Sequence, residues 1–73
     1  MEKYYFLVDC GSYTKKLTYK QYLLYMESHP GRGFKVLKSD YKALENSLKG
    51  VILRDKTTFI FNRLHAAGKT AAA

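Results

Sequence analysis

The stretch TYKQYLLYMESHP, residues 18–30, decides the expected fold, because both of its ends carry signals for the limits of a helix. Thr18 and Gln21 form a capping-box pair, in which the threonine oxygen accepts a hydrogen bond from a free amide and the glutamine side chain bonds back to the cap amide. Pro30 closes the stretch, since proline disfavours helical geometry in the residue before it. The sequence therefore predicts a helix over about residues 18–29.

The apolar side chains of this helix recur at i, i+3, i+4 and i+7, which is the spacing of one helical face. A helix with one apolar stripe needs a surface to cover, so we expect the stripe to pack on a sheet. Its members are Tyr19, Tyr22, Leu23 and Met26. Leu23 is expected to be buried deeply enough that Leu23→Asp would unfold the domain.

Strand patterns lie on both sides of the helix. Residues 4–10 (YYFLVDC) predict a first strand that ends at the following glycine. Residues 13–17 (YTKKL) are either a short edge strand after a Gly-Ser link or a loop into the helix. Residues 34–38 (FKVLK) predict another strand. One face of the first strand is expected to carry Tyr4, Phe6, Val8 and Cys10.

The second half of the chain predicts a short helix and then a hairpin. Ser39 and Asp40 are a capping signal, and apolar residues at helical spacing follow, so a second helix over about residues 40–49 is possible. Residues 51–54 and 57–63 flank Asp-Lys and predict a hairpin whose two faces are both apolar. Such a hairpin is either central in the sheet, or it presents one face to a partner or to a second copy of the chain.

These elements predict one α+β domain over residues 1–65, with a mostly antiparallel sheet of four to five strands covered by one main helix. Residues 66–73 (AAGKTAAA) have no apolar period and little side chain to bury. We expect them to be a disordered or expression-derived tail outside the fold.

The composition points to a small basic protein. The chain has 73 residues, with 13 Lys and Arg against 6 Asp and Glu, which gives a formal charge of +7. This excess favours anionic partners such as nucleic acid or an acidic protein surface, although a net charge of about 2–8 also serves solubility alone. Cys10 is the single cysteine, and neither a signal peptide nor a membrane-spanning run is apparent, so we expect a cytoplasmic protein with no membrane contact.

No motif carries catalytic chemistry. Gly68-Lys69-Thr70 looks like the end of a phosphate-binding loop, but Arg63 stands where that loop needs a glycine. Cys10, His29 and His65 lie in separate elements, and no third ligand for a metal lies near the histidines. We therefore expect no enzyme activity, no cofactor, no metal and no small-molecule substrate.

Arg32-Gly33-Phe34, within GRGFKVLK, resembles the start of a signature of the RNA-recognition-motif family. In that family a basic residue, a glycine and an aromatic residue begin a strand that stacks bases. The following Lys35, Val36 and Leu37 depart from the signature. The resemblance implies a sheet that contacts RNA through an aromatic side chain.

The leading hypothesis is a small basic module that binds nucleic acid or a nucleic-acid-bound protein. Lysines near off-stripe tyrosines suit single-stranded nucleic acid, because bases stack on aromatic rings while cations contact phosphates. The alternative is a protein-binding accessory or inhibitor protein, in the style of phages and mobile elements, that acts on a host enzyme or homodimerises through the apolar hairpin. The residues expected to contact the partner are Lys15, Lys16, Lys20, Tyr25, Arg32, Lys35 and Lys38.

Overall fold

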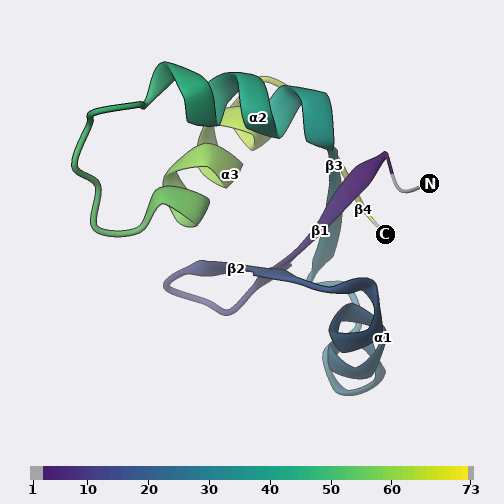
Figure 1. Cartoon of the computed structure of the whole chain (residues 1–73). Helices are drawn as coiled ribbons and strands as arrows, with labels where there is room; N and C mark the ends of the chain where they lie inside the picture. The colour runs from purple at the N-terminus through teal and green to yellow at the C-terminus, as the bar shows by residue number, and fades with distance from the viewer. Residues whose placement is uncertain (1–2, 73) are drawn as a thin grey trace.

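A computed structural model describes residues 3–72 and places a four-stranded sheet between helices on its two faces. The strands form one antiparallel sheet in the order β2-β1-β3-β4, and three helices pack around it (Figure 1). The expected α+β class with an antiparallel sheet of four to five strands is confirmed, but three helices stand in place of the one main helix and possible second helix that the sequence predicts. The elements are β1 (Tyr4–Asp9), β2 (Thr14–Leu17), α1 (Tyr19–Ser28), β3 (Gly33–Leu37), α2 (Lys38–Ser47), α3 (Lys56–Ala66) and β4 (Thr70–Ala72).

The register of β1 separates its side chains into two sets. Leu7 lies opposite Phe34 on β3 and opposite Lys16 on β2, so these three side chains share one face of the sheet. That face packs on α2 and α3, whereas Phe6 on the other face contacts α1 through Tyr22. The sheet is therefore covered on both faces, by different helices.

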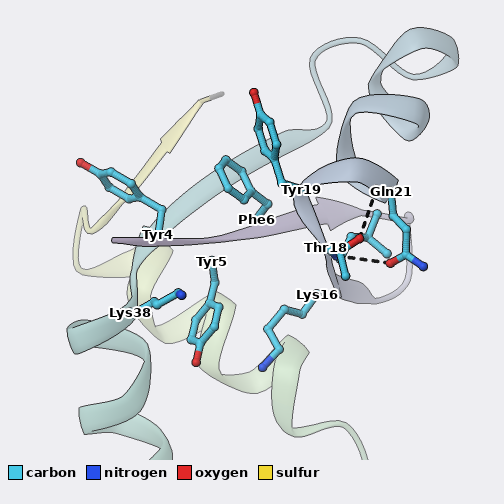
Figure 2. A pocket seen from close by; sticks show the side chains of 9 residues that line it. Tyr4, Tyr5, Phe6, Lys16, Thr18, Tyr19, Gln21 and Lys38 are labelled. Atoms are coloured by element: carbon cyan, nitrogen blue, oxygen red, sulfur yellow. Dashed lines mark hydrogen bonds between the residues drawn. The ribbon is translucent and has the colours of Figure 1, made fainter. Parts of the chain in front are cut away.

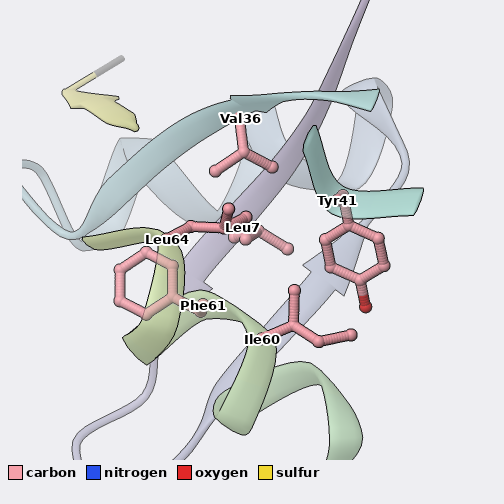
Figure 3. Close-up of a cluster of buried hydrophobic side chains, with 6 residues drawn as sticks. All are labelled: Leu7, Val36, Tyr41, Ile60, Phe61 and Leu64. Atoms are coloured by element: carbon pink, nitrogen blue, oxygen red, sulfur yellow. The ribbon is translucent and has the colours of Figure 1, made fainter. Parts of the chain in front are cut away.

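The core lies between the sheet and the α2–α3 pair (Figure 3). Tyr41 is 2 % exposed, and its hydroxyl lies 3.3 Å from Thr57 Oγ1, so this large ring is buried with its polar atom satisfied. Partly buried Tyr5 and Phe34 extend the cluster along the sheet. The buried members are Leu7, Val36, Tyr41, Ile60, Phe61 and Leu64.

Helix α1 begins as its sequence predicts. The amide of Gln21 donates to Thr18 Oγ1 at 3.2 Å, and the Thr18 amide donates to Gln21 Oε1 at 3.3 Å, which completes the capping box. The helix approaches the sheet closely at Gly33, where a Cβ would lie 2.6 Å from Met26 Sδ and nearer still to the Tyr22 hydroxyl. The absence of a side chain at Gly33 is what lets α1 lie against β3.

The expected stripe of α1 is only half right. Tyr22 is 4 % exposed, but Tyr19 and Leu23 are each 48 % exposed. Tyr25 is half-buried instead, and its hydroxyl donates to the Asp9 carbonyl at 3.3 Å. The contact face is thus centred on Tyr22 and rotated toward Tyr25, so the expectation that Leu23 is buried was wrong.

The expected hairpin over residues 51–63 was also wrong, because most of these residues form helix α3. Asp55 is the N-cap of this helix: its carboxylate accepts from the Thr58 amide at 3.1 Å and from Thr58 Oγ1 at 2.7 Å. These hydrogen bonds lower the pKa of the Asp55 carboxyl. Ile60, Phe61 and Leu64 then fall on one helical face and enter the core.

The C-terminal residues differ from the expected tail as well. Thr70–Ala72 forms β4, which pairs with β3 so that Thr70 lies opposite Val36 and Ala72 opposite Phe34. The ring nitrogen Nδ1 of His65 lies 2.7 Å from Thr70 Oγ1, and this hydrogen bond connects β4 to the end of α3. Ala73 lies outside the described residues. The possible strand at residues 13–17 is present as β2, and the possible second helix is present as α2.

Tyr22→Phe is expected to raise the free energy of unfolding by about 1 kcal/mol. The Tyr22 hydroxyl is buried, and nothing within residues 3–72 offers it a hydrogen-bond partner. Burial, with a smaller effect of neighbouring Tyr19, raises the pKa of Tyr22. Removing this hydroxyl removes a desolvated polar group and keeps the ring.

Urea denaturation of the wild type and Tyr22→Phe measures the change. Tyr25→Phe is the matched control, because it removes a hydroxyl that has a partner, and it should lower stability. A lower unfolding midpoint for Tyr22→Phe would contradict the assignment of Tyr22 as an unsatisfied group.

Candidate functional site

Part of one sheet face is left open because α1 is short. The helix has 10 residues and so spans about 15 Å, whereas β1 with 6 residues spans about 20 Å. The helix lies over the Val8–Gly33 end of these strands. Within residues 3–72, no helix covers the opposite end, where Tyr4 pairs with Leu37, and Leu37 is 39 % exposed.

Three aromatic side chains project together from this open end, and we name them the aromatic platform: Tyr4, Phe6 and Tyr19 (Figure 2). The rings of Phe6 and Tyr19 have centroids 5.0 Å apart, and Phe6 also packs on Tyr22 at 4.9 Å. Tyr4 and Phe6 are two residues apart on one strand, which spaces them by about 6.6 Å. Lys35 on β3 places its ammonium 4.8 Å from the centroid of Tyr4.

Two more lysines lie on the other side of β1, and we name them the lysine pair: Lys16 and Lys38 (Figure 2). Their ammonium groups lie 4.4 Å and 5.3 Å from the centroid of the Tyr5 ring. Because β2 ends at Leu17, opposite Phe6, no strand in the described part of the chain pairs with Tyr4 and Tyr5 on the β2 side of β1. A hollow of about 430 Å³ occupies this edge and connects the lysine pair with the aromatic platform.

The positive charge of the site is not neutralised by nearby carboxylates of the described residues. Across residues 3–72, the only ion pair within 4.0 Å joins Lys69 to Asp40, at 3.9 Å. Tyr41 lies 5.0 Å from the ammonium of Lys16, and burial, opposed by the Thr57 hydrogen bond, raises the pKa of Tyr41. Its hydroxyl therefore stays neutral at physiological pH, and the site presents cations beside aromatic rings.

The predicted site residues do not form a single cluster. Lys16 and Lys38 form the lysine pair, Lys35 lies at the aromatic platform, and Lys20 is exposed next to Tyr19 at the start of α1. Lys15 is exposed on the edge strand β2.

Tyr25 and Arg32 lie at the opposite end of the sheet. The Arg32 carbonyl accepts from the Asp9 amide at 2.9 Å, and the Tyr25 ring stacks on His29 with centroids 4.4 Å apart. Partial burial and the hydrogen bond to Cys10 raise the pKa of Tyr25, against an opposing effect of Arg32. These two residues are therefore separate from the aromatic platform.

The sequence places Tyr19 on the packing stripe of the helix, and Tyr4 and Phe6 on one face of the first strand, so it predicts none of the three as a site residue. The available signal was the first strand itself, which is apolar on both faces while a single short helix was expected to cover one of them. Phe34, which the family resemblance implies as a base-stacking residue, faces the core instead and packs on Phe61 at 5.1 Å.

The site offers flat aromatic rings and lysine ammonium groups, a combination that suits planar, anionic ligands. In the part of the chain that the structure describes, no cluster of three His, Cys, Asp or Glu could hold a metal ion. Likewise, none of the described helices has the length and apolar character needed to cross a bilayer. Comparison of the chain with protein-family models, with curated proteins and with solved structures gives no match, so the side chains of this site carry the inference of function.

Proposed function

We propose that the chain is a small non-enzymatic module that binds single-stranded nucleic acid on the aromatic platform. The observation that carries this proposal is the set of aromatic rings at the open end of the sheet face that α1 partly covers, with lysines on either side of the same strand. Nucleic-acid bases stack on exposed aromatic side chains, and lysines contact the phosphates that connect them.

The geometry of the platform favours binding of single-stranded nucleic acid over binding of a duplex. A base in a duplex is already stacked on both sides, so only an unpaired base can lie flat on a tyrosine ring. Tyr4 and Tyr19 flank Phe6, and Tyr19 is 48 % exposed. The platform therefore offers rings at Tyr4 and Tyr19 on which unpaired bases of an extended strand can stack.

The lysines supply attraction that does not depend on base sequence. Lys35 lies on the platform side of β1 and the lysine pair on the other side, so a strand crossing the open edge at Tyr4 meets cations on both sides. Each phosphate contact releases bound counterions, and affinity therefore falls as salt rises. The formal charge of +7 acts in the same direction at longer range.

Titration of a fluorescent 12-nucleotide single strand by anisotropy tests the proposal. Tyr19→Ala is expected to weaken binding about 5- to 150-fold, which corresponds to the loss of one stacked base. Tyr13→Ala is the matched control: Tyr13 is 46 % exposed against 48 % for Tyr19 but lies away from the platform, and its loss should leave affinity within about twofold.

The salt dependence gives a second readout. Lys35→Gln and Lys38→Gln should each reduce the slope of log affinity against log salt by about 0.7, the value for one phosphate contact to a single strand. A duplex of the same sequence should compete poorly. Absence of binding at low salt, or an equal loss in Tyr13→Ala and Tyr19→Ala, would contradict the proposal.

A protein-binding role is the second candidate, and one observation favours it. The loop between α2 and α3 carries Ile52, which is 99 % exposed, beside Val51, which is 48 % exposed. Exposed aliphatic side chains next to each other on a loop suit contact with an apolar pocket of a partner. In an accessory or inhibitor role, this loop would contact the partner, in place of the apolar hairpin that the sequence predicts.

A further inference from the structure

The lysine pair brings two ammonium groups to one aromatic ring. The nitrogens of Lys16 and Lys38 lie 4.4 Å and 5.3 Å from the centroid of Tyr5, and both side chains line the hollow of about 430 Å³ (Figure 2). Within residues 3–72 the only ion pair joins Lys69 to Asp40, so no described carboxylate lies within 4.0 Å of either nitrogen of the pair. Two like charges held this close repel each other, and an anion between them lowers that repulsion. Both charges are therefore available to one anion in the hollow.

The backbone of Tyr4 adds a donor to the same hollow. On β1 the Asp9 amide donates to the Arg32 carbonyl, on the β3 side, and the Cys10 amide donates to the Tyr13 carbonyl, on the β2 side. Backbone groups alternate between the two sides of an antiparallel strand, so the N–H and C=O of Tyr4 point toward the β2 side. Strand β2 ends before it reaches Tyr4, and Tyr4 lines the hollow. Its N–H therefore faces the hollow, where a phosphate oxygen can accept from it.

The core closes the sheet face beyond the lysine pair. Tyr5 packs edge-on against Tyr41 of α2 with centroids 5.1 Å apart, and Tyr41 is 2 % exposed. Among the described residues, the lining of the hollow includes Lys38 but nothing further along α2 and nothing from α3. A strand that leaves the aromatic platform over the open edge therefore reaches the lysine pair with no lined path past it. Such a place suits the end of a strand.

We propose that the lysine pair binds a terminal phosphate of the single strand whose bases stack on the aromatic platform, an inference that rests on the proposed function. A terminal phosphomonoester carries a charge of about −1.5 to −2 at neutral pH and presents three acceptor oxygens. A phosphodiester inside a strand carries a single negative charge. Two ammonium groups and a backbone amide match the larger charge and the additional oxygen of the terminal group. A 5′ phosphate and a 3′ phosphate share this chemistry.

Competition against the fluorescent strand of the anisotropy titration tests the proposal. The unlabelled competitors have one sequence and end in a 5′ phosphate, a 3′ phosphate or hydroxyl groups only. At least one phosphorylated strand should bind about tenfold more tightly than the hydroxyl strand, which lies within the combined effect of two exposed charge pairs. The strand that gains affinity identifies the end that enters the hollow. A hydroxyl strand longer by two nucleotides has about the same total charge as the phosphorylated strand and should compete less well.

Variants of the lysines separate a phosphate site from general attraction of charge. Lys16→Gln and Lys38→Gln should each reduce the preference for the phosphorylated strand to about threefold, and the two changes together should abolish it. Lys15→Gln is the matched control, because Lys15 is the exposed neighbour of Lys16 on β2 but lies opposite Val8, on the other face of the sheet. This change should leave the preference intact. Circular dichroism checks that each variant is folded.

The outcomes distinguish this proposal from the proposed function. Equal affinity of phosphorylated and hydroxyl strands, or a preference that survives in the Lys16→Gln, Lys38→Gln double variant, would overturn the terminal-phosphate site. The proposed function would then still stand if Tyr19→Ala weakened the binding of every strand alike. Absence of binding of all strands at low salt would overturn both.

Discussion

Asn62→Pro is expected to unfold the domain, whereas Asn62→Ala should leave it folded. Asn62 is an exposed residue in the interior of α3, so neither change removes a core contact. Proline removes one helical hydrogen bond and clashes with the preceding turn, at a cost of about 3 kcal/mol or more. A domain of this size has a total stability of roughly 4–11 kcal/mol, so this loss is a large fraction of it.

Far-ultraviolet circular dichroism and thermal melting measure the effect. Alanine favours a helix over asparagine, so Asn62→Ala should raise the melting temperature slightly if residues 56–66 are helical. In the hairpin that the sequence predicted, the same change would not lower it either, because asparagine is at least as poor a strand former as alanine, so the helical far-ultraviolet spectrum is what separates the two folds. An Asn62→Pro variant that melts like the wild type would exclude α3 as a structural helix.

The contrast between α1 and α3 explains which elements could be predicted from sequence. The capping box of Thr18 and Gln21 is a local signal, and the helix that it predicts is present. At α3 the signal is ambiguous: the Asp-Lys pair predicts a turn, whereas the Asp55 carboxylate caps a helix through Thr58. The flanking residues are apolar on both strand faces, and periodicity cannot separate a strand from a helix in such a run.

The remaining errors come from long-range pairing. Thr70–Ala72 has no strand pattern of its own, and its place is set by the free edge of β3 and by the bond between His65 and Thr70. The aromatic platform depends in the same way on where α1 ends relative to β1. Charge alone predicted Lys16, Lys35 and Lys38 as site residues, and their role in binding stays a prediction. Tyr4 and Tyr19 could be recognised only once the packing was known.

Leu7→Ala is expected to lower the free energy of unfolding by about 3 kcal/mol, while Leu23→Ala should change it by about 0.5 kcal/mol or less. The two changes delete the same atoms. Leu7 is 0 % exposed in the centre of the α2–α3 core, so its loss leaves a cavity, whereas Leu23 is 48 % exposed on α1. Urea denaturation of both variants gives the two values on one scale.

The result for Leu23 also bears on the proposed function. If Leu23→Ala cost as much as Leu7→Ala, α1 would have to cover more of the sheet than its contacts at Gly33 and Phe6 indicate. The open end of β1 would then be closed, and bases would have no access to Tyr4. The proposed function therefore requires a small change in the free energy of unfolding for Leu23→Ala and a large one for Leu7→Ala. That result would show that the α2–α3 side of the sheet stabilises the fold and that the aromatic platform on the other side is accessible.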